Sequence, residues 1–406
     1  MPPYFGENPE PMRAITHFLI ALFLLFWAVP AEADLRSEAD SVAGKGAVVR
    51  VVDSEGDVLL DIGGETAFIP ASTLKVFTVA LAAEYLDMDS HFETAFFLVG
   101  DKLVVRGGGD PYLVSEELDL VASGLKEALA GEALSGIWID DAAFAPGIVI
   151  PGAGKSEKPY DALNSATAVN FNQINVKRVD GKIVSAEEQT PLTPLAARRA
   201  KAMGITSEDR INISSDPAAV RRYASELLAA KLRQVGVSVG EGEGAMSAPE
   251  TPPLYVHANS RTLSEVCHEA LYWSNNYITN QVFLTVGAKV HGYPATLEKA
   301  QRVAATFLAE RPELAGFTVI EGSGLSYDNR ATAPAFIALL NLFAPHKVLL
   351  RQKYDTPNKT GTLRVRKSVV GYLDTKKHGT VRFVISLDGK GFYRKWKVLE
   401  LLRKQL

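Results

Sequence analysis

The feature that most constrains the fold is the placement of the β-strand patterns, which lie at both ends of the chain with helical patterns between them. Two apolar runs around a polar turn, 47–52 and 58–62, predict a strand pair. Three further strand patterns lie near the C-terminus: 358–365, 368–375 and 380–388. Helical periodicity recurs upstream of them: 262–273, 276–288, 296–309 and 334–344. We therefore predict an α/β fold in which a terminal antiparallel sheet is packed by helices.

The length of the chain predicts more than one domain. A chain of 406 residues with 47% hydrophobic side chains is globular and exceeds the usual size of one core. The terminal strands require a core that the middle of the chain interrupts. We expect that core over 34–96 and 216–406, and an inserted domain over 97–215.

The N-terminal segment has the pattern of a secretory signal. An apolar block over 14–29 follows Arg13 and precedes Ala31-Glu32-Ala33, which suits a signal peptidase. We expect a signal peptide over 1–33 with cleavage after Ala33; an uncleaved membrane anchor is the alternative. Residues 1–11 carry two glutamates and no Lys or Arg, so translation starts at either Met1 or Met12.

Composition excludes several classes of function. The net charge of −4 gives no electrostatic case for nucleic acid as a partner. The single Cys267 cannot form an intrachain disulfide, and the seven histidines lack metal-ligand spacing, so we expect no metal and no cofactor. The charge is sorted along the chain, because 347–406 holds 16 Lys or Arg against four acidic residues. The helix expected over 392–406 has an apolar stripe beside these basic residues. We favour packing of this stripe on the terminal sheet; contact of the stripe with a membrane surface is the alternative and is not required.

Three short motifs follow one another along the chain: Ser72-Thr73-Leu74-Lys75, Ser274-Asn275-Asn276 and Lys359-Thr360-Gly361. Each is weak alone, and S-x-x-K occurs again from Ser123 to Lys126. The position of the serine in its predicted helix distinguishes the two copies. Ser72 falls in the first turn of an apolar helix, where free N–H groups favour negative charge, whereas Ser123 falls in the middle of an amphipathic one.

The residue types suit acyl transfer. Serine is a poor nucleophile until a base takes its proton, and a lysine among apolar groups and other cations can have its pKa lowered enough to act as that base. Spacing i, i+3 puts Lys75 on the helix face of Ser72. Ser274 can relay the proton and Asn276 can hold a substrate amide. Lys359 and Thr360 can receive a terminal carboxylate.

The remaining roles concern the strand and the oxyanion. Gly361 would let an edge strand approach the substrate backbone closely. The backbone N–H groups of Ser72 and Thr362 are natural donors to an oxyanion.

The three motifs in this order resemble the serine penicillin-recognising enzymes. The chain is most similar to the D-Ala-D-Ala carboxypeptidase/endopeptidase family of class C low-molecular-weight penicillin-binding proteins, peptidase family S13. Further segments carry this resemblance: 70–78 (PASTLKVFT), 103–114 (LVVRGGGDPYLV), 138–144 (WIDDAAF), 321–330 (EGSGLSYDNR) and 358–373 (NKTGTLRVRKSVVGYL).

The resemblance implies a penicillin-binding-protein-like transpeptidase fold with an inserted domain. It implies an exported, periplasmic serine carboxypeptidase that acts on the D-Ala-D-Ala end of peptidoglycan stem peptides, with or without endopeptidase activity, and that β-lactams acylate at Ser72. It assigns Lys75 as the base, Ser274 and Asn276 as relay and substrate donor, and Lys359, Thr360 and Thr362 as carboxylate and oxyanion contacts.

Other interpretations stay open. Taken alone, Ser72 could cap a helix, Ser274 or Asn276 could cap the next one, and Lys359 could block a sheet edge. The run 107–111 (GGGDP) reads as a turn, although Asp110 could face the cleft. A β-lactamase-like hydrolase is a second function, and a non-catalytic peptidoglycan-binding module is a third.

Overall fold

The computed structural model describes residues 31–154 and 156–406. The expected signal peptide lies outside the described residues up to position 30, and its last three residues fall in the first turn of helix α2 (Ala31–Ala43). Within the described part of the chain, no helix combines the length and the apolar character needed to cross a membrane.

A six-stranded antiparallel sheet joins the two ends of the chain, as the strand patterns predict. Its strands run in the order β11-β12-β13-β14-β1-β2. Their bounds are β11 (Arg351–Gln352), β12 (Pro357–Thr362), β13 (Arg366–Asp374), β14 (Thr380–Asp388), β1 (Val48–Val52) and β2 (Val58–Ile62). β1 lies beside β14, with Val51 opposite Phe383. The N-terminal strands therefore complete a sheet that the C-terminal strands begin.

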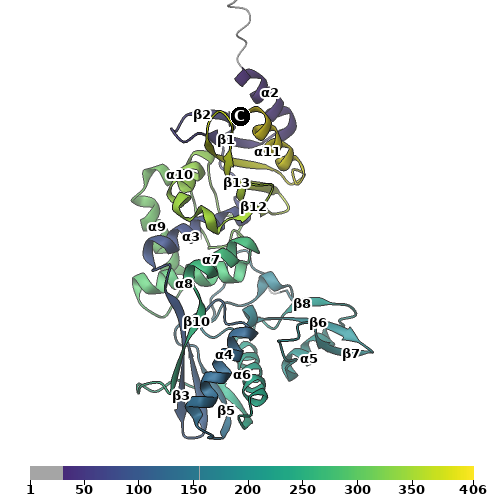
Figure 1. The fold of residues 1–406 in the computed structure, drawn as a ribbon, viewed down its shortest axis with the longest axis vertical. Helices are drawn as coiled ribbons and strands as arrows, with labels where there is room; N and C mark the ends of the chain where they lie inside the picture. Colours follow the sequence, from purple (N-terminus) through teal and green to yellow (C-terminus); the bar gives the residue numbers. More distant parts are fainter. Residues whose placement is uncertain (1–30, 155) are drawn as a thin grey trace, which may run out of the picture.

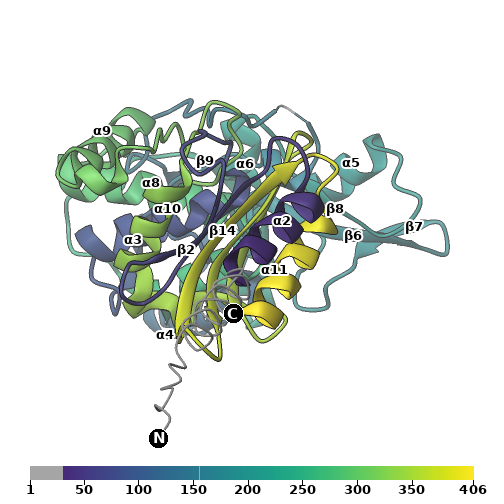
Figure 2. The same cartoon turned by 90° about the horizontal axis from the view of Figure 1, so that it is seen from above.

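Helices cover both faces of this terminal sheet because its central strands are apolar on both sides. Val51 and Phe383 pack into a core with α2 and α11 (Arg394–Gln405), and these two helices lie side by side over the sheet (Figure 2). Val384 and Val370 point the other way, into the largest core of the molecule. This alternation is the period-two pattern of strands buried on both faces.

The largest core holds a group of helices below the terminal sheet in Figure 1. They are α3 (Lys75–Tyr85), α7 (Leu263–Tyr272), α8 (Asn276–His291), α9 (Leu297–Ala309) and α10 (Ala333–Phe343). Every residue of α8 from Tyr277 to Ala288 is buried, including polar ones such as Asn280 and Gln281, so this helix is enclosed on all sides, and it packs against α3. The short 3₁₀ turn η1 (Ala71–Leu74) precedes α3 directly.

A second sheet forms the lower part of the molecule in Figure 1. Its five strands, in spatial order, are β10 (Tyr255–Thr262), β3 (His91–Val99), β4 (Lys102–Gly107), β5 (Leu134–Asp140) and β9 (Val239–Ala245). Helices α4 (Ser115–Leu129) and α6 (Pro217–Gln234) pack on one face of it. A three-stranded sheet projects to the side in Figure 1, in the order β7 (Lys182–Ser185), β6 (Gln173–Val179) and β8 (Asp209–Asn212), with α5 (Pro194–Ala202).

The second sheet includes residues on both sides of the domain boundaries that we expect at 96/97 and 215/216. β3 begins at His91, and α6, β9 and β10 extend the same sheet and core to Thr262. The sequence did not predict this extension because β9 (VGEGEGA) alternates glycine and glutamate, which are uncommon in strands. In the structure β9 nevertheless pairs in parallel with β5. The division into domains itself stays a prediction.

Candidate active site

Ser72 lies on η1, the tight turn that leads into α3. Pro70 precedes it, and Ala71 has a φ of +53°, which a side chain with a Cβ adopts only at a cost in conformational energy. Gly324 packs against this turn so closely that a Cβ there would overlap the carbonyl oxygen of Ala71. The strained backbone is therefore held from outside by a neighbouring loop.

Lys75, fully buried, is the link between the first two motifs. Its Nζ donates to Ser72 Oγ at 3.2 Å, to Asn276 Oδ1 at 2.6 Å and to the carbonyl oxygen of Ser323 at 2.6 Å. Burial lowers the pKa of Lys75 to about 7, while the negative charge of Glu321 acts in the opposite direction. Near neutral pH this amine is therefore available to accept a proton from the serine hydroxyl beside it.

The second motif occupies the break between α7 and α8. Ser274 has a φ of +58°, and α8 begins directly after Asn275. Asn275 caps the helix, since its Oδ1 accepts from the backbone N–H of Ile278 at 3.1 Å. Asn275 is therefore the residue that caps α8. The side chain of Asn276 contacts Lys75, and the side chain of Ser274 contacts Lys359.

Lys359 is buried on β12 and contacts the second motif from the opposite side. Its Nζ donates to Ser274 Oγ at 2.8 Å and to the carbonyl oxygen of Thr360 at 3.1 Å. Burial, together with the positive charges of Lys75, Lys395 and Arg351, lowers the pKa of Lys359 well below its usual value. A carboxylate placed here would relieve this repulsion, so the site favours an anion.

The edge of β12 is open where the third motif lies. β11 pairs only with Pro357 and Asn358, so no other strand among residues 31–154 and 156–406 covers that edge from Lys359 to Thr362. Thr362 is exposed and Thr360 is half-buried. Gly361, which stays a predicted substrate contact, is also needed by the fold, because a Cβ there would lie 2.6 Å from the carbonyl oxygen of Pro70.

The structure thus brings five predicted side chains together in two contacting groups: Ser72 and Asn276 around Lys75, and Ser274 with Lys359. The two lysines are near enough for each charge to influence the other. Thr360, Gly361 and Thr362 line the adjoining edge. A nucleophile, a base of near-neutral pKa and a cationic anchor beside an open strand edge can together acylate a serine with an extended peptide that ends in a carboxylate.

Glu321 is a functional residue that the motifs did not reveal. This carboxylate is buried and accepts from the backbone N–H groups of Ser323 and Gly324, at 2.8 and 2.7 Å, and from Asn329 Nδ2 at 2.8 Å. These bonds fold the loop that presents the Ser323 carbonyl to Lys75. The segment 321–330 belongs to the family resemblance, but an isolated glutamate gives no signal of its role in a sequence.

Two other candidates lie away from this network. Ser123, in the second S-x-x-K, donates its hydroxyl to the carbonyl of Asp119 within α4 at 2.9 Å. Asp110 is buried and accepts from Asn259 Nδ2 at 2.8 Å and from the backbone N–H of Tyr112 at 2.7 Å. Burial raises the pKa of Asp110 to about 6. Its hydrogen bonds tie the turn after β4 to β10, which is a structural role.

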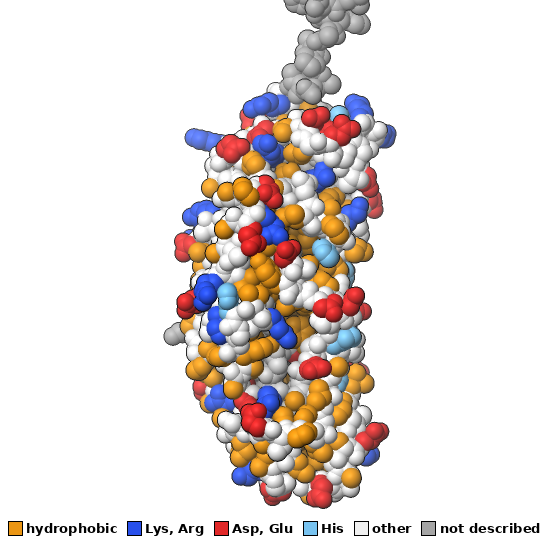
Figure 3. All heavy atoms as spheres, turned by 90° about the vertical axis from the view of Figure 1, so that its left-hand side faces the viewer, with side chains coloured by type: hydrophobic (Ala, Val, Ile, Leu, Met, Phe, Trp, Pro, Cys, Tyr) orange, Lys and Arg blue, Asp and Glu red, His pale blue; other side chains and the backbone are white. Residues whose placement is uncertain are grey.

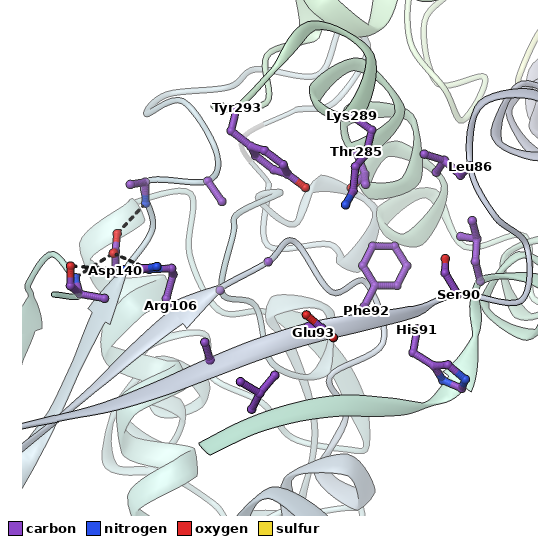
Figure 4. Close-up of a pocket in the computed structure, with 18 of the residues that line it drawn as sticks. Leu86, Ser90, His91, Phe92, Glu93, Arg106, Asp140, Thr285, Lys289 and Tyr293 are labelled. Carbon is purple, nitrogen blue, oxygen red and sulfur yellow. Dashed lines mark hydrogen bonds and ion pairs between the residues drawn. The ribbon is translucent and has the colours of Figure 1, made fainter. Parts of the chain in front are cut away.

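A cavity of about 1150 Å³ lies elsewhere, between the five-stranded sheet and the C-terminal end of α8. Figure 4 shows Lys289 and Tyr293 on one side of it and Phe92, Glu93 and Arg106 on the other. Figure 3 shows hydrophobic, acidic and basic side chains mixed over the lower half of one face of the molecule. No residue of the three motifs lines this cavity. Size alone therefore does not locate the reactive site.

Comparison with known proteins gives a family and a fold class. The profile of the D-Ala-D-Ala carboxypeptidase 3 (S13) family matches residues 33–203 and 206–354. The D-alanyl-D-alanine carboxypeptidase DacB of Haemophilus influenzae is 22% identical over 88% of this chain and 84% of its own length. The D-alanyl-D-alanine carboxypeptidase of an Actinomadura species is 24% identical over 82% of this chain and 76% of its own. The crystal structure of penicillin binding protein 4 from Haemophilus influenzae superposes with a TM-score of 0.70, at 18% identity, over 90% of this chain and 99% of that one.

Proposed function

Since the chain belongs to the D-Ala-D-Ala carboxypeptidase 3 (S13) family of serine peptidases, we propose that it removes the terminal D-alanine of peptidoglycan stem peptides through an acyl-enzyme on Ser72. The observation that carries this proposal is the 3.2 Å contact between Ser72 Oγ and the Nζ of a buried Lys75 whose pKa is about 7. The family and fold class predicted from the motifs are confirmed.

The acylation step follows from these contacts. Lys75 Nζ takes the Ser72 hydroxyl proton as Oγ attacks the carbonyl carbon of the penultimate D-alanine. The negative charge that develops on the carbonyl oxygen is met by the backbone N–H groups of Ser72 and Thr362. The C–N bond then breaks, and the proton that Lys75 took passes through Ser274 Oγ, which Lys359 holds at 2.8 Å, to the departing amine, so that Lys75 is neutral again. Terminal D-alanine leaves as the free amino acid.

Deacylation reverses the proton transfers with water as the nucleophile. Lys75 removes a proton from water, hydroxide attacks the ester carbonyl, and Ser72 Oγ leaves with a proton returned by Lys75. The peptide is released with a new carboxyl end. Asn276 Oδ1, which accepts from Lys75 at 2.6 Å, keeps the amine directed toward the serine, and its Nδ2 can hold a substrate amide carbonyl.

The terminal carboxylate of the substrate sets the orientation of the peptide in the site. We assign the terminal carboxylate of the substrate to Lys359, Thr360 and Thr362, because the cationic cluster around Lys359 favours a negative charge. The open edge of β12 can pair with the extended backbone of the peptide. An endopeptidase cut uses the same acyl-enzyme on a cross-linked peptide, in which the leaving amine belongs to a second stem.

Labelling with a penicillin tests the nucleophile. Purified protein forms a covalent adduct with a fluorescent penicillin, because the β-lactam ring acylates the serine that attacks it, and Ser72→Ala abolishes the adduct. Ser123→Ala, in the second S-x-x-K, leaves labelling unchanged. Adduct formation by the Ser72→Ala protein would refute the assignment.

Product analysis separates the alternatives. Release of D-alanine from a pentapeptide supports the carboxypeptidase, and conversion of cross-linked muropeptides to monomers supports endopeptidase activity. Rapid turnover of nitrocefin would favour the β-lactamase-like hydrolase. Binding of peptidoglycan without release of D-alanine would favour the non-catalytic module.

The substrate defines where the protein acts. Peptidoglycan lies outside the cytoplasmic membrane, so we propose export of the chain to the periplasm by the apolar segment over 14–29. N-terminal sequencing of the secreted protein should give a start near Asp34. A mature protein that retains residues 14–29 would show an anchor instead.

A further inference from the structure

The C-terminal region carries an excess of basic residues around the edge of the terminal sheet that adjoins the active site. The segments 351–367 and 388–397 hold ten Lys or Arg residues against Asp355 and Asp388. The two segments lie against each other, since Lys353 Nζ is 4.7 Å from the centre of the Trp396 ring. Asp388 is paired with Arg394 at 2.5 Å, which leaves the exposed Asp355 as the acidic side chain that faces the remaining cations of these two segments.

Exposed aromatic rings lie among these cations. Tyr354 is 56% exposed, Phe392 45% and Tyr393 74%. The Phe392 and Tyr393 rings pair edge to face at 5.1 Å, and Tyr354 packs on Trp396 at 5.0 Å. We call this region the basic aromatic surface: Lys353, Tyr354, Lys390, Phe392, Tyr393 and Lys397. Three large rings left in water beside unpaired lysines indicate a binding surface.

This surface is continuous with the reactive site around the edge of the terminal sheet. Arg351 lies 4.7 Å from the Tyr272 ring of α7, on the helical side where Ser274 lies. Lys353, two residues on, lies over Trp396 of α11, on the opposite side of the sheet. The charges of Arg351 and Lys395 both act on Lys359. Positive potential therefore extends from the carboxylate anchor to the outer face of β11 and α11.

We propose that the basic aromatic surface binds the part of a peptidoglycan strand that lies beyond the reacting stem peptide. Its lysines would meet the carboxylates of neighbouring stems, and its exposed rings would stack on the apolar faces of the sugars. This inference rests on the proposed function, since it takes the polymer as the substrate. It adds a site that engages only a long strand, and a short peptide held at Lys359 does not reach it.

The packing of α11 favours a glycopeptide strand over a membrane as the occupant. Leu399, Leu402 and Leu406, which continue the apolar stripe, are buried in the core under the terminal sheet. The large apolar side chains that this surface exposes are three aromatic rings, two of them paired, and they form no continuous helical face, whereas insertion into a lipid surface needs such a face. The surface also adjoins the strand edge where the peptide is cleaved.

The test compares two substrates. The charge-reversed double variant Lys353→Glu/Lys397→Glu is assayed on insoluble peptidoglycan sacculi and on a short acyl-tripeptide that ends in D-Ala-D-Ala. Lys126→Glu/Lys182→Glu is the matched control, because both lysines are exposed and lie on α4 and β7. We expect kcat/KM on sacculi to fall about tenfold in the test variant only, with the tripeptide unchanged within about twofold. Added salt should reduce wild-type activity on sacculi toward that of the variant.

A binding assay separates this inference from the proposed function. Ser72→Ala protein should sediment with sacculi, and Lys353→Glu/Lys397→Glu in that background should weaken the binding about tenfold; Tyr393→Ala should weaken it as well. Unchanged binding, or equal losses on both substrates, would overturn the proposal. Sedimentation with anionic lipid vesicles that depends on these residues, without binding to sacculi, would assign the surface to a membrane instead. Failure of the wild type to release D-alanine from the tripeptide would refute only the proposed function.

Discussion

At the scale of single residues, the proposed mechanism depends on one buried amine. Lys75 is surrounded by protein on all sides and has three acceptors, and burial nonetheless disfavours its charged form. The ammonium form is stabilised only by those acceptors and by Glu321. A small change in this environment therefore shifts the pH at which the serine becomes nucleophilic.

The first prediction is a pH dependence of acylation. With a pKa of about 7, Lys75 is protonated below neutrality and cannot accept the Ser72 proton. The second-order rate of penicillin acylation should rise through pH 7 and fall about tenfold per pH unit below pH 6. Stopped-flow measurement of adduct formation from pH 5 to 9 checks this. A rate independent of pH over that range would remove Lys75 as the base.

The same lysine affects stability with a defined sign. Its pKa is lower in the folded protein than in the unfolded chain, so the unfolded chain binds more protons between pH 7 and about 10.5. The free energy of unfolding therefore increases as the pH rises through that range, because deprotonation of Lys75 in the folded protein costs less free energy as the pH approaches 10.5. Lys75→Met should flatten this part of the stability curve, as measured by urea unfolding at pH 7 and pH 9. A parallel dependence in both proteins would contradict the assignment.

The second prediction concerns Glu321. Glu321→Gln keeps the shape but loses the charge that raises the pKa of Lys75, so the acylation profile should shift to lower pH. The loop would also lose charge-assisted bonds, at a cost of about 2–4 kcal/mol in the free energy of unfolding. Ser323→Ala is the control, because it removes one bond to Glu321 without changing charge. Its acylation midpoint should match that of the wild type.

At the scale of elements, the active site is made by close approaches between the strained turn η1, the strand β12 and the loop that follows α9. The glycines at the two contacts, Gly361 and Gly324, leave no room for a side chain. Sequence reasoning located both segments and predicted a substrate contact at Gly361, but it did not predict this packing, because a motif does not show which backbone lies across from it. Asn275 was missed for a similar reason, since a cap is recognised only once the helix start is fixed to the residue.

The third prediction tests the contact of the loop with η1. Gly324→Ala places a Cβ against the carbonyl of Ala71, so the turn that carries Ser72 must shift. We expect a loss of at least tenfold in penicillin acylation and about 2–4 kcal/mol of stability. Gly181→Ala is a matched control, with a φ of +76° against +84° at Gly324 and open space around it. That control should cost only about 1 kcal/mol and leave acylation unchanged.

At the scale of the whole molecule, two large cores lie under two sheets. The terminal sheet was predictable because β1, β13 and β14 are rich in buried β-branched and aromatic residues, with few polar ones among them. The extent of the middle region was not, because α6 carries no sign of which core it packs on and β9 alternates glycine with glutamate. A local sequence pattern reveals a helix or a strand, whereas the element that it packs against depends on contacts between residues far apart in the sequence.

The fourth prediction follows from these separate cores. Calorimetry should resolve two unfolding transitions, because the core around α4 and α6 shares no buried residue with the core around α3 and α8. Covalent attachment of a penicillin at Ser72 should raise only the transition of the latter core. A single transition that shifts as a whole would show that the two cores unfold together.

The pairing of β1 with β14 also fixes the order in which this protein becomes an enzyme. The nucleophile is made early in synthesis, but its sheet and its carboxylate anchor wait for the last strands of the chain. Contacts between such distant segments form late, after the local ones. A chain whose last strands have not yet paired therefore holds Ser72 without its sheet and its carboxylate anchor, and we expect hydrolysis only once those strands have folded.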